Sequence, residues 1–202
     1  MSEVIASLGQ FFVYMVTALF AQNAVFTRGL GVSRLTKIVD DGTDTLTFGV
    51  LLCCIQIISA PLGYFANRAM REFAYRGYVR PFVCVVCSAV AFFVVLGAVV
   101  ALRRLESARH AVAALPMATF NTCVLGTMLV SATQSFSLVQ TMGFAVGSGL
   151  GYVMAVLVVD EGMRKLDGER VPEIFRGLPV TLLYIGILAL AIYGFTGHTV
   201  TY

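Results

Sequence analysis

The sequence predicts an all-α integral membrane protein with six transmembrane helices. Of the 202 residues 58% are apolar and only 12% are charged, and the charges are missing over five long stretches. The uncharged stretches run from Glu3 to Arg28, Asp44 to Arg68, Arg80 to Arg103, Arg109 to Asp160, and Arg176 to the C-terminus. Each is long enough for a helical bilayer crossing, which needs about 20 residues. The chain therefore has too few polar residues to coat a soluble core in water.

Each expected helix starts near one charged residue and stops before the next, because a charged side chain in hydrocarbon is costly. The fourth stretch is long enough for two crossings and is divided between two helices. The expected helices lie near residues 4–27, 45–67, 81–102, 112–131, 138–159 and 178–196. The first is not expected to be a cleaved signal peptide, because its only early charge is Glu3 and it has no basic leader.

The charges of the predicted loops orient the chain across the membrane. If the N-terminus is outside, the cytoplasmic loops carry ten basic residues and the external loops carry four. Lys and Arg accumulate in cytoplasmic loops, so both termini are expected outside. The external arginines between residues 68 and 80 fit this orientation least well. The net charge of +3 is thus a topology signal, and no nucleic-acid partner is expected.

The chain is expected to form a single membrane domain, 1–202, built of two inverted three-helix repeats of approximately 1–106 and 107–202. Three helices are an odd number, so the two halves have opposite orientations in the membrane. The first helix of each half carries amide and hydroxyl groups and is expected to be interrupted. These groups, Gln22, Asn23, Asn121 and Thr122, form a candidate half-helix site between the repeats. Alternatively, they only bridge neighbouring helices.

Small residues in the fifth helix indicate close helix packing. Gly143, Gly147 and Gly151 are spaced four residues apart, so they share one face and let another backbone approach. This face suits a dimer partner. The four cysteines of helices two and three, Cys53, Cys54, Cys84 and Cys87, behave as small apolar residues there, and their role stays open. No phosphate-binding loop, histidine-rich metal cluster or catalytic group is recognised.

Short motifs distributed along the whole chain resemble the A-type subunit (RnfA) of the Rnf electron-transport complex and the similar E-type subunit (NqrE) of the sodium-pumping NADH:quinone reductase. The motifs are Gln22-Asn23, Gly31-Val32-Ser33, Asn121-Thr122-Cys123-Val124-Leu125-Gly126, Gly143-Phe144-Ala145, Pro172-Glu173-Ile174-Phe175-Arg176-Gly177, and Gly194-Phe195-Thr196-Gly197. The resemblance implies six helices, inverted halves and an external N-terminus. It also implies a homologous partner of opposite orientation, and a [2Fe-2S] cluster to which each of the two proteins supplies one Cys per half-helix.

This sequence departs from that pattern at the cluster ligands. The stretch from Ala24 to Leu30 contains no Cys, where the family has one shortly before its Gly-Val-Ser. In helix four the family reads Asn-Cys, whereas here Thr122 follows Asn121 and Cys123 comes one place later, about 100° around a helix. Cys123 is therefore the one candidate cluster or metal ligand, and we expect no cofactor in this chain alone. A [2Fe-2S] cluster shared with a partner subunit is the alternative.

The resemblance implies a membrane subunit of an Rnf/Nqr-like ion-translocating electron-transport complex. Such a protein helps to carry electrons across the bilayer or scaffolds that path, and it is at most a non-catalytic part of the translocase. Its expected partners are membrane lipid, other Rnf-like subunits and the homologous subunit, or a second copy in a homodimer. It is expected in a bacterial inner membrane. The alternative function is a small secondary transporter or channel-like protein with the same inverted-repeat fold.

Overall fold

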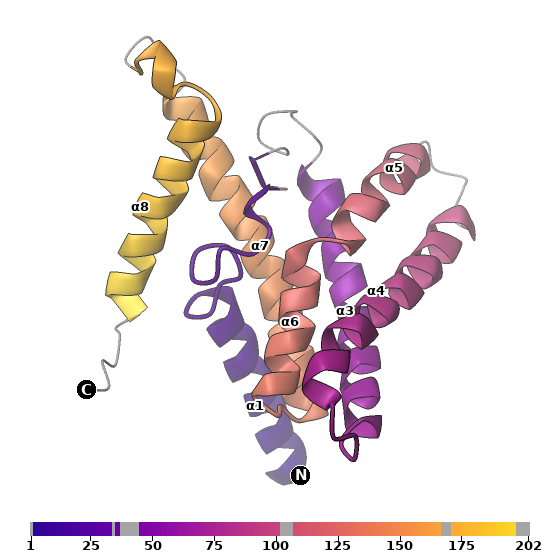
Figure 1. The fold of residues 1–202 in the computed structure, drawn as a ribbon. Coiled ribbons are helices and arrows are strands. Elements are labelled where there is room, and N and C mark those ends of the chain that lie inside the picture. The colour runs from indigo at the N-terminus through magenta and orange to yellow at the C-terminus, as the bar shows by residue number, and fades with distance from the viewer. Residues whose placement is uncertain (1, 34, 37–44, 102–106, 167–170, 197–202) are drawn as a thin grey trace.

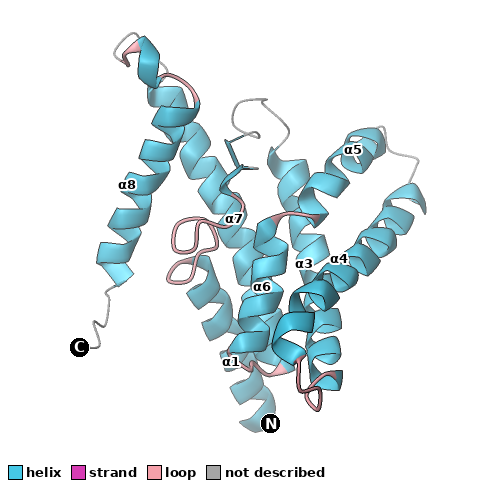
Figure 2. Cartoon of the chain, in the orientation of Figure 1, coloured by secondary structure: helices cyan, strands magenta, loops and turns pink. Residues whose placement is uncertain are grey.

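The structure is a computed structural model, and it describes residues 2–33, 35–36, 45–101, 107–166 and 171–196. Within this part every regular element is helical and no strand occurs (Figure 2). The helices are α1 (Ser2–Leu19), α3 (Thr45–Ala69), α4 (Arg76–Ala101), α5 (Ser107–Thr119), α6 (Thr122–Thr133), α7 (Leu138–Leu166), the 3-10 turn η1 (Glu173–Phe175) and α8 (Leu178–Thr196). The predicted all-α fold is confirmed.

Five segments of the described chain are long and apolar enough to cross a membrane, with α5 and α6 counted as the single segment Val112–Thr133. Successive segments run in alternating directions through the bundle (Figure 1). The expected ranges 45–67, 138–159 and 178–196 lie inside α3, α7 and α8. Helix α4 begins five residues before the expected start at 81, and residue 102 lies outside the described residues. The chain is thus a multi-pass α-helical membrane protein.

The first helix is shorter than predicted. We expected it to run to residue 27, but α1 ends at Leu19, and residues 20–31 form turns instead. The prediction was wrong because an uncharged sequence does not reveal where a helix unwinds when a side chain replaces the helical hydrogen bonds. Asn23 supplies that replacement, as described below.

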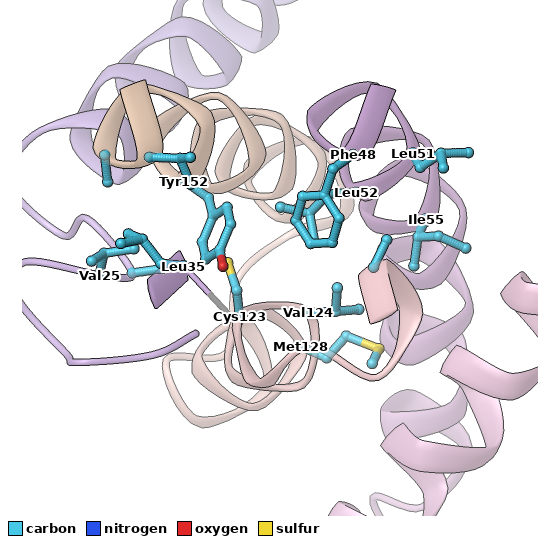
Figure 3. Close-up of a cluster of buried hydrophobic side chains, with 14 of the residues drawn as sticks. Val25, Leu35, Phe48, Leu51, Leu52, Ile55, Cys123, Val124, Met128 and Tyr152 are labelled. Atoms are coloured by element: carbon cyan, nitrogen blue, oxygen red, sulfur yellow. The ribbon is translucent and has the colours of Figure 1, made fainter. Parts of the chain in front are cut away.

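Helix α7 is the centre of the bundle. It packs on α1 and on α3, while α4, α5 and α6 pack on α3. Tyr152, Leu52 and Val124 belong to one core of fully buried side chains between α3, α6 and α7 (Figure 3). Helix α8 is different, because only Thr181 and Ile185 among its residues are buried. Most of its apolar surface faces outward, as expected of a helix in lipid.

The three spaced glycines of α7 lie against the backbone of α1. A Cβ atom at Gly143 would collide with the carbonyl oxygen of Phe11, and one at Gly147 with that of Met15. At Gly151 it would lie 3.1 Å from the carbonyl oxygen of Leu19. Only glycine permits such an approach of two helix backbones. This face of α7 is therefore covered by α1 of the same chain, and it is not available to a dimer partner.

Candidate functional site

The break after α1 is organised by the side chain of Asn23, which is fully buried. Its Oδ1 accepts from the backbone N–H of Val25 (2.9 Å) and Phe26 (3.3 Å). Its Nδ2 donates to the carbonyl oxygens of Leu19 (2.9 Å) and Gly151 (3.0 Å). One side chain thus bonds to three backbone groups at the end of α1 and in the unwound segment. Its fourth bond, to the carbonyl oxygen of Gly151, ties the segment to α7. Such replacement of helical hydrogen bonds is necessary in a water-poor interior.

The second break separates α5 from α6 and is organised in the same way by Asn121, which is also fully buried. Asn121 is the N-cap of α6, with extended backbone, and its Oδ1 accepts from the N–H of Cys123 at 2.9 Å. In both breaks an Asn caps the residue two places later. Val25 in the first break therefore corresponds to Cys123 in the second, and the two equivalent positions hold an apolar side chain and a thiol.

The two breaks meet at Gly31. Its backbone N–H donates to Thr122 Oγ1 at 2.7 Å, and its carbonyl oxygen accepts from the hydroxyl of Tyr152 at 3.0 Å. Gly31 has a φ of +79°, which a residue with a Cβ rarely adopts. A Cβ there would also lie 2.7 Å from Asn121 Oδ1. Glycine is thus required both by the backbone conformation and by the close approach of the second break.

Cys123 lies in a polar cluster inside the chain. Its sulfur accepts from Gln56 Nε2 of α3 (3.3 Å) and lies 3.5 Å from Ser148 Oγ of α7. Ser148 Oγ is in turn 2.8 Å from Thr127 Oγ1, which donates to the carbonyl oxygen of Cys123. The thiol is fully buried, and it lies among the packed side chains between α3, α6 and α7 (Figure 3). It therefore faces its own bundle, not the protein surface.

Two buried polar atoms of the site lack a hydrogen-bond partner in the described structure, the Oε1 of Gln56 and the Nδ2 of Asn121. Such groups are uncommon in a folded interior. They leave the site with one acceptor and one donor that the described residues do not use.

The structure brings together three of the four predicted half-helix residues, Asn23, Asn121 and Thr122, and places the fourth apart. Gln22 is half-buried and has a different partner, because its Oε1 accepts from the guanidinium of the exposed Arg28 at 3.1 Å. Sequence reasoning missed Gln56 and Tyr152. Gln56 had a usable signal, because it is the one side-chain amide in the uncharged stretch between Asp44 and Arg68 before Asn67. Tyr152 had none, since a tyrosine within an apolar helix is ordinary.

The residues at the breaks do not fit a four-thiolate [2Fe-2S] cluster. Such a cluster takes a Cys at each ligand position. Thr122, the residue that directly follows Asn121, is exposed and bonds to Gly31. Cys123 is turned to the other side, into the core. The ligand position of the first break holds no Cys.

The sequence profile of the family described as "Rnf-Nqr subunit, membrane protein" matches residues 11–199. The chain is 25% identical to the A-type subunit of the Na(+)-translocating ferredoxin:NAD(+) oxidoreductase complex of Acetobacterium woodii, over 91% of this chain and 95% of the relative. It is 24% identical to the E-type subunit of the Na(+)-translocating NADH-quinone reductase of Psychromonas ingrahamii, over 90% and 95%. It is 21% identical to the A-type subunit of the ion-translocating oxidoreductase complex of Shewanella oneidensis, over 94% and 98%.

Proposed function

We propose that this chain, which belongs to the Rnf-Nqr family of membrane subunits, is a membrane subunit of an ion-translocating electron-transport complex. The observation that carries this is the family match, which extends over residues 11–199. The relatives that match over their whole length are named as subunits of ferredoxin:NAD(+) or NADH-quinone oxidoreductase complexes. The chain therefore acts in a multi-subunit assembly, together with other subunits.

The exposed part of the first break supports a partner subunit on that face. Thr27, Arg28 and Gly29 are exposed, and both breaks lie at the middle of the bundle's height (Figure 1). A charged side chain at the centre of a bilayer costs about 3 kcal/mol or more, and unwound backbone is not tolerated against lipid. A protein surface that covers this loop removes both costs. We infer that a homologous subunit of opposite orientation provides this surface, and a second copy of the chain is the alternative.

We propose further that this chain alone holds no [2Fe-2S] cluster and contributes to the electron path as a scaffold. Two observations support this. The thiol of Cys123 is buried among Gln56, Thr127 and Ser148 of its own chain, where a partner's cysteine cannot reach it. The equivalent position in the first break is Val25. If a cluster is bound at all, Cys123 is the one residue of the two breaks able to ligate it.

Analysis of iron and acid-labile sulfide tests the cluster proposal. The assembly is purified without oxygen, with wild-type chain and with Cys123→Ser, which keeps a small polar side chain in the same cluster. We expect equal iron in the two preparations. Iron that is stoichiometric with the wild-type chain and lost in Cys123→Ser contradicts the proposal.

The proposed localisation is a bacterial inner membrane with both termini outside. It is supported by the uneven distribution of basic residues among the loops.

The function itself is tested in the source organism. The full chain carries an affinity tag at its native level of expression, and the gene is deleted and then restored in parallel strains. We expect flavin- or iron–sulfur-containing subunits to co-purify, and we expect membrane electron transfer and the coupled ion uptake by inverted vesicles to be lost on deletion and recovered on restoration. A chain that purifies without such subunits, and whose loss leaves both activities unchanged, refutes the proposal.

A further inference from the structure

A small pocket lies between the end of α3, the end of α6 and the start of α7. Figure 1 shows that the α3–α4 and α6–α7 turns share one end of the bundle, away from the two breaks. Polar residues from the end of α3, the end of α6 and the start of α7 line it: Asn67, Arg68, Arg71, Ser131, Ser135 and Thr141. The enclosed part has a volume of about 20 Å³, which is enough for one oxygen-sized group. The pocket is open on one side, so a larger ligand can enter with a single atom.

The hydroxyl of Thr141 is the feature that points to a ligand. Thr141 is only 2% exposed, and its Oγ1 has no hydrogen-bond partner in the described structure. Threonines elsewhere in these helices donate to the carbonyl four residues earlier, as Thr119 does to Leu115 and Thr181 to Gly177. An unpaired buried hydroxyl lowers the stability of the folded chain. An acceptor atom that entered the pocket would remove this cost.

The mouth of the pocket carries unpaired positive charge. Arg68 and Arg71 are exposed, and within the described part of the chain neither guanidinium lies within ion-pair distance of a carboxylate. A basic side chain such as Arg68 is favourable in the last turn of α3, because the C-terminal end of a helix carries partial negative charge. This preference does not account for the buried hydroxyl of Thr141, which belongs to another helix. Guanidinium groups bind phosphate oxygens through two parallel hydrogen bonds, so the mouth suits a phosphate.

Exposed aromatic side chains place this end of the bundle at the level of the lipid headgroups. Phe73, Tyr75 and Tyr78, in and just after the α3–α4 turn, are 67%, 72% and 82% exposed. Tyrosine collects at the interface between hydrocarbon and water, because its ring is apolar and its hydroxyl is polar. A phosphate at this depth is most readily supplied by a phospholipid.

We propose that this pocket binds the phosphate of an anionic phospholipid headgroup. One phosphate oxygen enters the enclosed part and accepts from Thr141 Oγ1, and the remaining oxygens accept from Arg68 and Arg71 at the mouth. The acyl chains then lie along the apolar outer surface of the bundle. The site lies apart from the helix breaks, and it is independent of any cluster or electron path.

Thermal unfolding of the full chain in a neutral detergent tests the proposal. The probes are dioleoyl phosphatidylglycerol, dioleoyl phosphatidylcholine and inorganic phosphate at equal concentrations. We expect phosphatidylglycerol to raise the unfolding midpoint in a saturable way, with a clearly smaller shift for phosphatidylcholine and for phosphate. Equal shifts with phosphate and phosphatidylglycerol identify a site for free phosphate and overturn the lipid assignment. Equal shifts with both lipids overturn the preference for an anionic headgroup.

Substitutions locate the site. Thr141→Val keeps the shape of the side chain and removes the unpaired hydroxyl, so it should leave the lipid-free midpoint unchanged or raised. It should weaken phosphatidylglycerol binding by about tenfold or more, as expected for loss of a hydrogen bond to a charged group. Arg68→Gln with Arg71→Gln should abolish the saturable shift. Arg164→Gln changes an exposed arginine at the opposite end of α7 and should leave it intact. An undiminished shift in Thr141→Val refutes the proposal.

Discussion

Replacing Gly147 by Ala should destabilise the chain, although alanine is a better helix former. The added Cβ would collide with the backbone carbonyl of Met15 in α1, and a backbone atom cannot move aside as the end of a flexible side chain can. Forcing an extra carbon into a packed core costs about 1–3 kcal/mol. Helix propensity offsets about 1 kcal/mol of this, so the steric cost has to be measured against a control with the same gain.

Gly186→Ala is that control. Gly186 lies in α8, and an added Cβ would meet no neighbouring atom within 4 Å. Alanine at this position should therefore raise stability through helix propensity alone. The free energies of unfolding of the two variants should therefore differ by about 1–3 kcal/mol. For a chain of this size, each kcal/mol shifts the unfolding midpoint by about 2–4 °C.

Unfolding is followed by labelling of the chain's own cysteines with a maleimide dye. Cys84, Cys87 and Cys123 are buried in the folded protein, whereas Cys54 is exposed and gives the starting signal. The unfolding midpoint of Gly186→Ala should be higher than that of the wild type. The midpoint of Gly147→Ala should be lower than that of Gly186→Ala. If Gly147→Ala unfolds at the temperature of Gly186→Ala or above it, the close packing of α1 on α7 is refuted.

Three further predictions concern the breaks and the topology. Asn23→Ala removes the bonds to three backbone groups of the break and the bond to Gly151 of α7, so it should lower the free energy of unfolding by about 2 kcal/mol or more. Gln22→Ala should change it by less than about 0.5 kcal/mol, and equal effects in thermal unfolding would contradict the role of Asn23. Thr122→Cys in a Cys123→Ser background should react with a maleimide in the folded chain much faster than Cys123 does in the wild type, because residue 122 is exposed and residue 123 is fully buried. Mass spectrometry of the labelled site measures the two rates, and equal rates refute the assigned orientation. A reporter fused to the C-terminus should read external and one inserted within 167–170, which lies outside the described residues, should read cytoplasmic; the reverse pattern overturns the proposed orientation.

The sequence was sufficient to predict the helical class and most crossings, because charge is excluded from hydrocarbon whatever the tertiary structure. It did not predict where the first helix ends. The signals were present in the sequence, since Asn23 is a good capping residue and glycine at positions 29 and 31 permits the positive φ that the structure has there. The predicted interruption of the first and fourth helices is confirmed, but uniform hydropathy over residues 4–27 concealed the position at which the first helix ends.

The site was predictable only in part, for a similar reason. Asn121 indicates a cap, and the structure has it at the N-terminus of α6. That Gly31 bonds to Thr122, or that Gln56 lies beside Cys123, depends on which helices become neighbours. Residues 31 and 122 are 91 positions apart, and no local pattern encodes such a pairing. The inverted repeat stays a prediction, supported by the equivalent capping by Asn23 and Asn121.

The glycine contact between α1 and α7 sets an order of events during synthesis. Helix α1 packs chiefly on α7, yet more than a hundred residues must be made between them. At about 5–20 residues per second, the N-terminal helix waits on the order of ten seconds in the bilayer before its main neighbour leaves the ribosome. Throughout that interval α1 is held by lipid or by the insertion machinery. Chains that terminate before residue 138 never receive α7, so they should be removed by membrane proteases even though α1 and the three spans that follow it are intact in sequence.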